Sequence, residues 1–195
     1  TPGLSSLMPR LVTGLGSELA TEYYCLSIEC AREAMAAAAK TDAKSVPFWA
    51  IAESKAAGHT LWEGFGSFHS GETPEDGLRF AHVHTQAKKS GYQGAIFIIG
   101  GRTPQLSGAE LAEVAQNLRA YEKKKKMVVG LCHDGGAYLL GFPTSLDPET
   151  WKKVPYGEDN MAEGLLLAIE EQGHEIIALK GKSAIEAPGD FKLVQ

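Results

Sequence analysis

The sequence has few of the features that mark several protein classes. Its 195 residues include only three cysteines, Cys25, Cys30 and Cys132, an odd number that suits reduced thiols better than a disulfide framework. No apolar run reaches the ~18 residues of a membrane-spanning helix, and the first residues lack the basic start and apolar core of a signal peptide. We therefore expect a soluble, cytoplasmic protein with no membrane partner.

Basic residues are also too few and too scattered for a nucleic-acid-binding surface. The formal net charge is −5, and the only basic run, residues 123–126, follows a predicted helix. His82 and His84 have the spacing of two ligands on one strand face, but no third ligand accompanies them. We predict no nucleic-acid partner, no metal and no cofactor.

A chain of this length is most economically one domain that buries about 70% of its unfolded surface. We predict a single α/β domain over residues 1–195, with an irregular lead-in over residues 1–16 and a C-terminal tail over residues 180–195.

The pattern of the chain centres on residues 94–136. Residues 95–99 form an unbroken apolar run, typical of a parallel strand covered on both faces. After the Gly100–Gly101 turn, apolar residues recur at helical spacing between residues 111 and 118, and residues 127–132 are again apolar and β-branched. This order predicts a right-handed βαβ unit whose strands end at one edge of a sheet, where ligands bind in such folds.

The other segments extend this pattern. A helix is expected over residues 17–40 and another over residues 158–172, and a strand over residues 45–52. Residues 80–85 alternate like a short strand, residues 66–79 have loop composition, and residues 137–142 suit either a helical turn or a strand. Residues 175–179 are a last strand or a packed tail. We predict a three-layer α/β/α sandwich with a mostly parallel sheet of about five strands, preceded by an N-terminal helix, with a flavodoxin-like sheet as the alternative.

Two loops at the predicted edge carry residues suited to chemistry. Gly100, Gly101, Arg102 and Thr103 offer backbone N–H groups, a cation and a hydroxyl to an anion. A glycine turn needed only for tight geometry explains the same pattern equally well. Cys132 beside His133 and Asp134 fits either a reactive thiol or a buried cysteine next to a surface histidine. Glu53 and Ser54 end the first predicted strand and would join the same edge.

The order of these segments resembles the sugar isomerase (SIS) domain of phosphosugar isomerases and phosphosugar-binding regulators. The resemblance rests on AESKAAGHT, AIFIIGGRTPQ, GLCHDGG and VPYGEDNMAEGLLLAI, and it covers roughly residues 20–172. It implies a phosphorylated sugar as ligand, a homodimer or higher homo-oligomer, and either aldose–ketose isomerisation or a non-catalytic sensor. The implied base is Glu53, His59 or His133. The implied substrate-binding residues are Ser54, Gly58, Thr60, Gly100, Gly101, Arg102, Thr103, Gln105, Asp134 and Gly135.

A second family competes on part of the same stretch. YQGAIFIIGGR and MVVGLCHDGGAYLLG are similar to the DJ-1/PfpI group, in which a cysteine, often followed by histidine, forms a nucleophile elbow after a strand. This resemblance implies a cysteine-dependent hydrolase or glyoxalase with Cys132 as nucleophile. It predicts that Cys132 is an exposed, reactive thiolate, whereas the SIS resemblance predicts a buried, slow thiol.

Overall fold

The computed structural model describes residues 1–5, 7–71, 76–99, 101–121, 125–158 and 160–193. Two helices open the chain, α1 (Pro9–Leu15) and α2 (Ser17–Thr41), separated by Gly16 at a φ of 85°. The predicted helix over residues 17–40 is confirmed. Two of its large apolar side chains face solvent, since Leu19 is 54% and Leu26 59% exposed. Four of its five buried residues are alanine or serine, and the helix that begins at Gly108 approaches it closely at Ala34 and Ala37.

The strands form two sheets. β1 (Phe48–Ile51) and β2 (Gly66–His69) make a parallel pair. The second sheet has four strands in the order β3 (Ala95–Ile98), β5 (Ala137–Phe142), β4 (Lys126–Leu131), β6 (Glu175–Ala178). β5 is antiparallel to β3 and to β4, and β6 is parallel to β4. The α/β class is confirmed, but the single sheet of about five mostly parallel strands is wrong.

In the predicted βαβ unit the two parallel strands are not neighbours in the sheet. β3, α4 (Gly108–Tyr121) and β4 follow the predicted order, and β3 and β4 run in the same direction. β5 returns through a tight turn and pairs between them. In that turn the Cys132 N–H donates to the Gly136 carbonyl at 2.8 Å, and Gly135 adopts a φ of 87° that favours glycine. β5 has a neighbouring strand on each side, and all six of its residues are buried.

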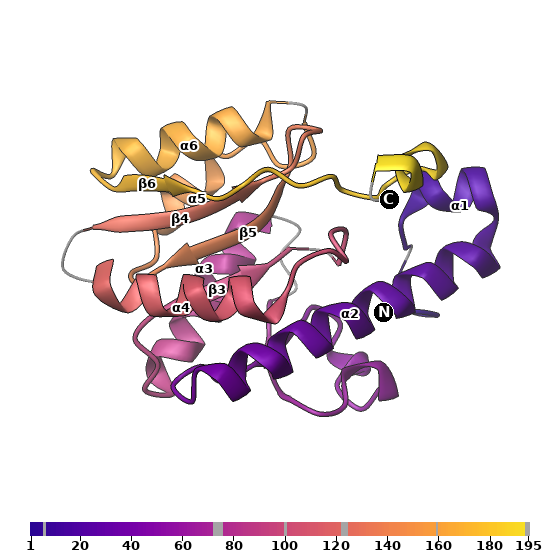
Figure 1. Cartoon of the computed structure of the whole chain (residues 1–195), viewed down its shortest axis with the longest axis horizontal. Coiled ribbons are helices and arrows are strands. Elements are labelled where there is room, and N and C mark those ends of the chain that lie inside the picture. The colour runs from indigo at the N-terminus through magenta and orange to yellow at the C-terminus, as the bar shows by residue number, and fades with distance from the viewer. Residues whose placement is uncertain (6, 72–75, 100, 122–124, 159, 194–195) are drawn as a thin grey trace.

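Helices cover both faces of the four-stranded sheet (Figure 1). α2 and α4 pack on the face that includes Val128, and α3 (Asp76–Lys89), α5 (Pro148–Lys152) and α6 (Met161–Glu171) pack on the face that includes Met127 and Val129. The alternation along β4 is the period of two expected for a strand between two layers. The helix predicted over residues 158–172 is confirmed as α6, which begins a few residues later than predicted. The strand predicted at residues 175–179 is confirmed as β6.

α3 corrects one prediction. Residues 80–85 are helical and not a strand, and β2 and the start of α3 occupy part of the predicted loop over residues 66–79. Val83, His84 and Ala87 are buried, at the i, i+1 and i+4 positions of a helix face. The short alternation of FAHVHT was too brief to distinguish the two periods. His82 is exposed and His84 is buried, so they do not share a face.

The C-terminal segment crosses the molecule after β6 and packs beside α1 (Figure 1). Ile185 is 1% exposed and lies in a small apolar cluster with Leu11 and Ala20. This predicted tail is therefore an ordered part of the fold over its described residues, and it reaches the edge where β3 ends. Among the described helices, none is long and apolar enough to cross a membrane.

The burial of His84 predicts a pH dependence of stability. Burial, with a smaller contribution from Lys88, lowers the pKa of His84 below its usual range, and its ring lies 5.2 Å from that of Phe142. The unfolded chain therefore binds the proton more readily, so stability is present above pH ~6.5 and is lost as the pH falls below it. His84→Phe should reduce the loss of unfolding free energy between pH 7.5 and 5.5 in urea titrations. The exposed neighbour variant His82→Phe should keep the loss, and an equal loss in both variants would contradict the assignment.

Candidate functional site

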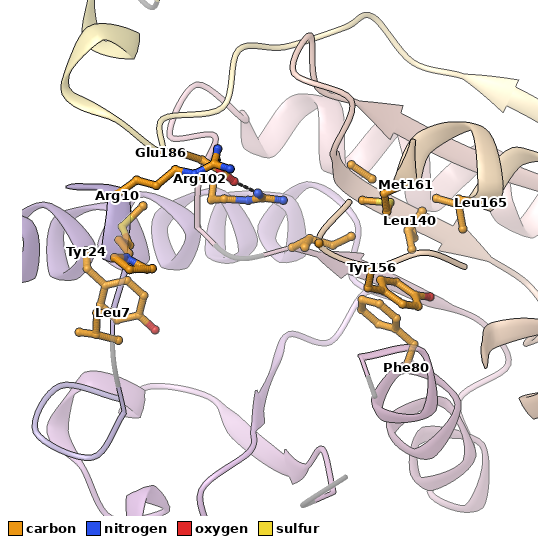
Figure 2. A pocket seen from close by; sticks show the side chains of 15 residues that line it. Leu7, Arg10, Tyr24, Phe80, Arg102, Leu140, Tyr156, Met161, Leu165 and Glu186 are labelled. Atoms are coloured by element: carbon orange, nitrogen blue, oxygen red, sulfur yellow. Dashed lines mark hydrogen bonds and ion pairs between the residues drawn. The ribbon is translucent and has the colours of Figure 1, made fainter. Parts of the chain in front are cut away.

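A cavity of about 500 Å³ opens where β3 ends (Figure 2). Six separate parts of the chain enclose it: α1 and the residues before it, α2, α3, the β3–β5 edge with the β3–α4 loop, α6 with the loop before it, and the C-terminal segment. The lining residues are Leu7, Met8, Pro9, Arg10, Tyr24, Phe80, Ile99, Arg102, Ala137, Leu140, Tyr156, Gly157, Met161, Leu165 and Glu186. It lies at the carboxyl end of β3, and of the described residues that the sequence predicted for a ligand only Arg102 lines it.

One end of the cavity is charged. Glu186 forms an ion pair with Arg102 through one carboxylate oxygen and with Arg10 through the other, at 3.3 Å to Arg10 Nη1. Arg102 and Glu186 are about three-quarters buried, whereas the side chain of Arg10 is 74% exposed. Figure 2 shows the three side chains converging from α1, the β3–α4 loop and the C-terminal segment. Of the charged side chains that line the cavity, two are therefore cationic and one is anionic.

The backbone around Arg102 is held from both sides. Gly101 adopts a φ of 60°, and a β-carbon there would lie 3.2 Å from Ser27 Oγ and from Ile28 Cδ1 on α2. The Arg102 carbonyl accepts the Ile185 N–H at 2.9 Å. The backbone at Arg102 is therefore held between α2 and the C-terminal segment, and its side chain extends into the cavity.

The other end of the cavity is apolar and aromatic. Phe80 and Tyr156 have ring centroids 6.2 Å apart, and Leu140, Met161 and Leu165 complete the wall (Figure 2). Tyr24 lies nearer the charged end. Burial raises the pKa of Tyr24 to about 12, and the charges of Glu53 and Cys25 add to this shift. At neutral pH its phenol is therefore a neutral hydrogen-bonding group.

A second, larger groove of about 620 Å³ has a different character. It lies between the two sheets, lined by β1, β3 and the facing sides of α2 and α4. Lys44 and Arg119 are the only charged side chains in its described lining, and Arg119 is paired with Asp42 at 2.8 Å. A polar ligand has little to bind there, so the smaller, charged cavity is the candidate site.

The structure brings together two of the three predicted loops. A β-carbon at Gly136 would lie 3.4 Å from Arg102 Nη2 and 3.2 Å from Asp134 Oδ1, so the arginine meets the turn that holds Asp134, Gly135 and Gly136. Asp134 Oδ1 accepts the Gly136 N–H at 3.0 Å. Gln105 points elsewhere, because its Nε2 donates to the Ser183 carbonyl at 2.8 Å. The Thr103 side chain is buried and its hydroxyl has no partner among the described residues. Gly100 lies outside the described residues.

The third predicted loop does not line the cavity. Glu53 accepts a hydrogen bond from the Thr1 hydroxyl at 3.1 Å and pairs with the Thr1 amino group. Burial by itself raises the pKa of Glu53, but hydrogen bonds from Ser5, its own backbone and Thr1 outweigh this and lower it to about 2, which makes it a weak base. His59 Nδ1 accepts the Leu61 N–H at 3.1 Å. Ser54, Gly58 and Thr60 are exposed, and none of these residues lines the cavity.

Cys132 is not a nucleophile of the elbow type. It is 6% exposed, and burial, with a contribution from Asp134 that Arg102 partly opposes, raises the pKa of its thiol to about 11. A thiol with this pKa is almost fully protonated at neutral pH, so it lacks the reactive thiolate. The His133 N–H donates to the Lys182 carbonyl at 3.0 Å, and the residue does not line the cavity. All three cysteines are free thiols, as the sequence predicted.

Sequence reasoning identified only Arg102 among the charged residues of the cavity. It missed Arg10 and Glu186, which come from the lead-in and the tail, and the wall residues Tyr24, Phe80 and Tyr156. No local pattern marks these residues, because they are brought together only by the packing of distant segments. Within the described part of the chain, no group of three or more His, Cys, Asp or Glu residues is arranged to hold a metal ion.

Comparison with solved structures identifies a similar fold. A protein from Desulfovibrio desulfuricans G20, provisionally named a nucleotide-diphospho-sugar transferase, superposes with a TM-score of 0.79 at 18% sequence identity. The match covers all of this chain and 81% of that one. At this identity the similarity establishes the fold and nothing more. Comparison with curated proteins finds no match.

Comparison with family models overturns both resemblances drawn from the sequence. The model described as "Uncharacterized protein conserved in bacteria (DUF2064)" matches residues 32–158. The SIS and DJ-1/PfpI interpretations are therefore wrong, and with them the isomerase, the phosphosugar sensor and the cysteine-dependent hydrolase or glyoxalase. Those resemblances rested on a strand–turn–helix–strand order that many α/β folds share. The chain belongs to the DUF2064 family.

Proposed function

We propose that this protein binds a nucleotide-diphospho-sugar in the 500 Å³ cavity and transfers the sugar to an acceptor. The observation that carries the proposal is the pairing of a two-arginine end with an aromatic, apolar end in one cavity at the carboxyl edge of β3. The fold similarity to a protein named for this class of reaction supports it. The volume also falls within the usual range of small-molecule sites.

The charged end suits the diphosphate. Guanidinium groups bind phosphate oxygens through parallel N–H bonds, and Arg102 and Arg10 approach the cavity from different segments. In glycosyl transfer the bond from the sugar's anomeric carbon to the diphosphate oxygen breaks while the acceptor oxygen bonds to that carbon. The charge left on the departing nucleoside diphosphate would be stabilised by these two arginines, and the acceptor's proton would leave with the departing diphosphate.

The aromatic end suits the rest of the ligand. Phe80 and Tyr156 provide ring surfaces, and Leu140, Met161 and Leu165 provide apolar area for a base or a sugar face. Ring stacking on a base is worth about 1–3 kcal/mol, and it tolerates different bases. The proposal therefore names the ligand class without selecting the base.

The test is binding of a panel of nucleoside diphosphates and their sugars, measured by calorimetry on the native protein and on Arg102→Gln. Each lost charged hydrogen bond costs about 1.5–3 kcal/mol, so we expect Arg102→Gln to weaken diphosphate binding about 100-fold. The control Arg119→Gln makes the same change at an arginine outside this cavity and should bind normally. Unchanged affinity in Arg102→Gln, or no binding of any member of the panel, would refute the proposal. Release of the nucleoside diphosphate from its sugar donor would report the transfer step.

A further inference from the structure

Glu186 occupies the position that a phosphate group would take in the candidate site. Each of its carboxylate oxygens pairs with a different arginine, Oε1 with Arg102 and Oε2 with Arg10. A phosphoryl group that bridged the two guanidinium groups would use two oxygens in the same way. The cavity therefore already contains an anion supplied by the protein.

The backbone at Glu186 is held independently of this carboxylate. Asp190 Oδ2 accepts the Glu186 N–H at 3.0 Å and the Ala187 N–H at 2.8 Å. On the other side, Ile185 is buried and its N–H donates to the Arg102 carbonyl. The segment can thus keep its place when the side chain of Glu186 turns away.

Displacement of the carboxylate is physically accessible. The Glu186 side chain is 24% exposed, so part of it already meets solvent, and rotation about its side-chain bonds would carry the carboxylate toward water. Asp134, the other carboxylate near Arg102, is held in the hairpin turn by the Gly136 N–H. Of these two carboxylates, Glu186 is the one that lines the cavity.

We propose that Glu186 is an internal anion that competes with the ligand and so sets the minimum charge the ligand must carry. This inference rests on the proposed function. A ligand group with one negative charge only replaces the single charge of the Glu186 carboxylate that it displaces. A diphosphate group brings two negative charges to the two arginines that Glu186 releases. Glu186 thereby selects diphosphate-containing ligands over singly charged phosphodiesters.

The test compares native protein with Glu186→Gln, which keeps the side-chain shape and removes the charge. The probes are inorganic pyrophosphate and dimethyl phosphate, a singly charged phosphodiester. We expect Glu186→Gln to bind pyrophosphate about tenfold more tightly in calorimetry, the scale of two partly exposed ion pairs. Dimethyl phosphate should raise the melting temperature of Glu186→Gln but not that of the native protein.

The matched control is Glu175→Gln. Glu175 begins β6 and pairs with Lys126 at the start of β4, at the opposite edge of the sheet from Arg102. Glu175→Gln therefore changes the net charge of the protein as Glu186→Gln does, but at a residue that does not line the cavity. This control should bind pyrophosphate as the native protein does.

Three other results would overturn the inference. Equal pyrophosphate affinity in the native protein and Glu186→Gln would show that the carboxylate does not compete, and weaker binding in Glu186→Gln would show that it positions the arginines. Both results leave the proposed function intact, because the native protein still binds. Absence of pyrophosphate and nucleotide binding in both proteins would overturn the inference and the proposed function together. If Glu186→Gln does not fold, Glu186→Ser provides the same comparison.

Discussion

Trp151→Ala is expected to lower the free energy of unfolding by about 4 kcal/mol. Trp151 is 0% exposed, its ring lies 5.4 Å from that of Phe80 and 5.7 Å from that of Phe142, and its Nε1–H donates to Ser145 Oγ at 3.1 Å. The substitution therefore leaves a large cavity between α5, α3 and the sheet. Chemical unfolding followed by circular dichroism measures the loss.

The conservative variant Trp151→Phe separates packing from the hydrogen bond. It keeps a ring against Phe80 and loses the indole N–H, so its cost should be near 1–2 kcal/mol. Because Phe80 also lines the candidate cavity, Trp151→Ala should weaken ligand binding more than Trp151→Phe. A loss below about 1 kcal/mol for Trp151→Ala would contradict the assignment of this side chain to the centre of the core.

Gly108→Val is expected to destabilise the protein by about 2–3 kcal/mol by overpacking. Gly108 begins α4 where it meets α2, and a β-carbon there would lie 2.5 Å from Ala37 Cβ and 2.9 Å from the Ala34 carbonyl oxygen. The nearest atom is a β-carbon fixed directly to the α2 backbone, and the next two are backbone atoms of α2, so none of them can move away as the end of a flexible side chain would. The two helices must separate, and α2 also carries Tyr24 of the candidate cavity.

Gly58→Val provides the matched control. No heavy atom lies within 4 Å of a β-carbon at Gly58, so the same substitution there should cost less than about 1 kcal/mol. Melting temperatures of both variants, measured under one condition, make the comparison. Equal destabilisation would show that the close approach of α2 and α4 is not what requires Gly108.

Local patterns predicted the elements whose signals are long or strong. α2, α4 and α6 have many turns of helical periodicity, and β3, β4 and β6 are short apolar runs bounded by turns. α3 was partly misread because six alternating residues satisfy both a strand and one face of a helix, and burial of Val83, His84 and Ala87 decided for the helix. The family was misread for a related reason, since the order strand, turn, helix, strand does not distinguish one α/β fold from another.

The sequence by itself determined the α/β class, the reduced thiols and a cation, Arg102, at the end of a strand. Each follows from local composition or spacing, which the chain carries before it folds. Only the tertiary structure decided that β5 pairs between β3 and β4, because strand order depends on which faces can be buried together. The candidate site also depends on the tertiary structure. More than 80 residues of sequence separate Arg10 from Arg102 and Arg102 from Glu186, and the three side chains meet only when the C-terminal segment packs against α1.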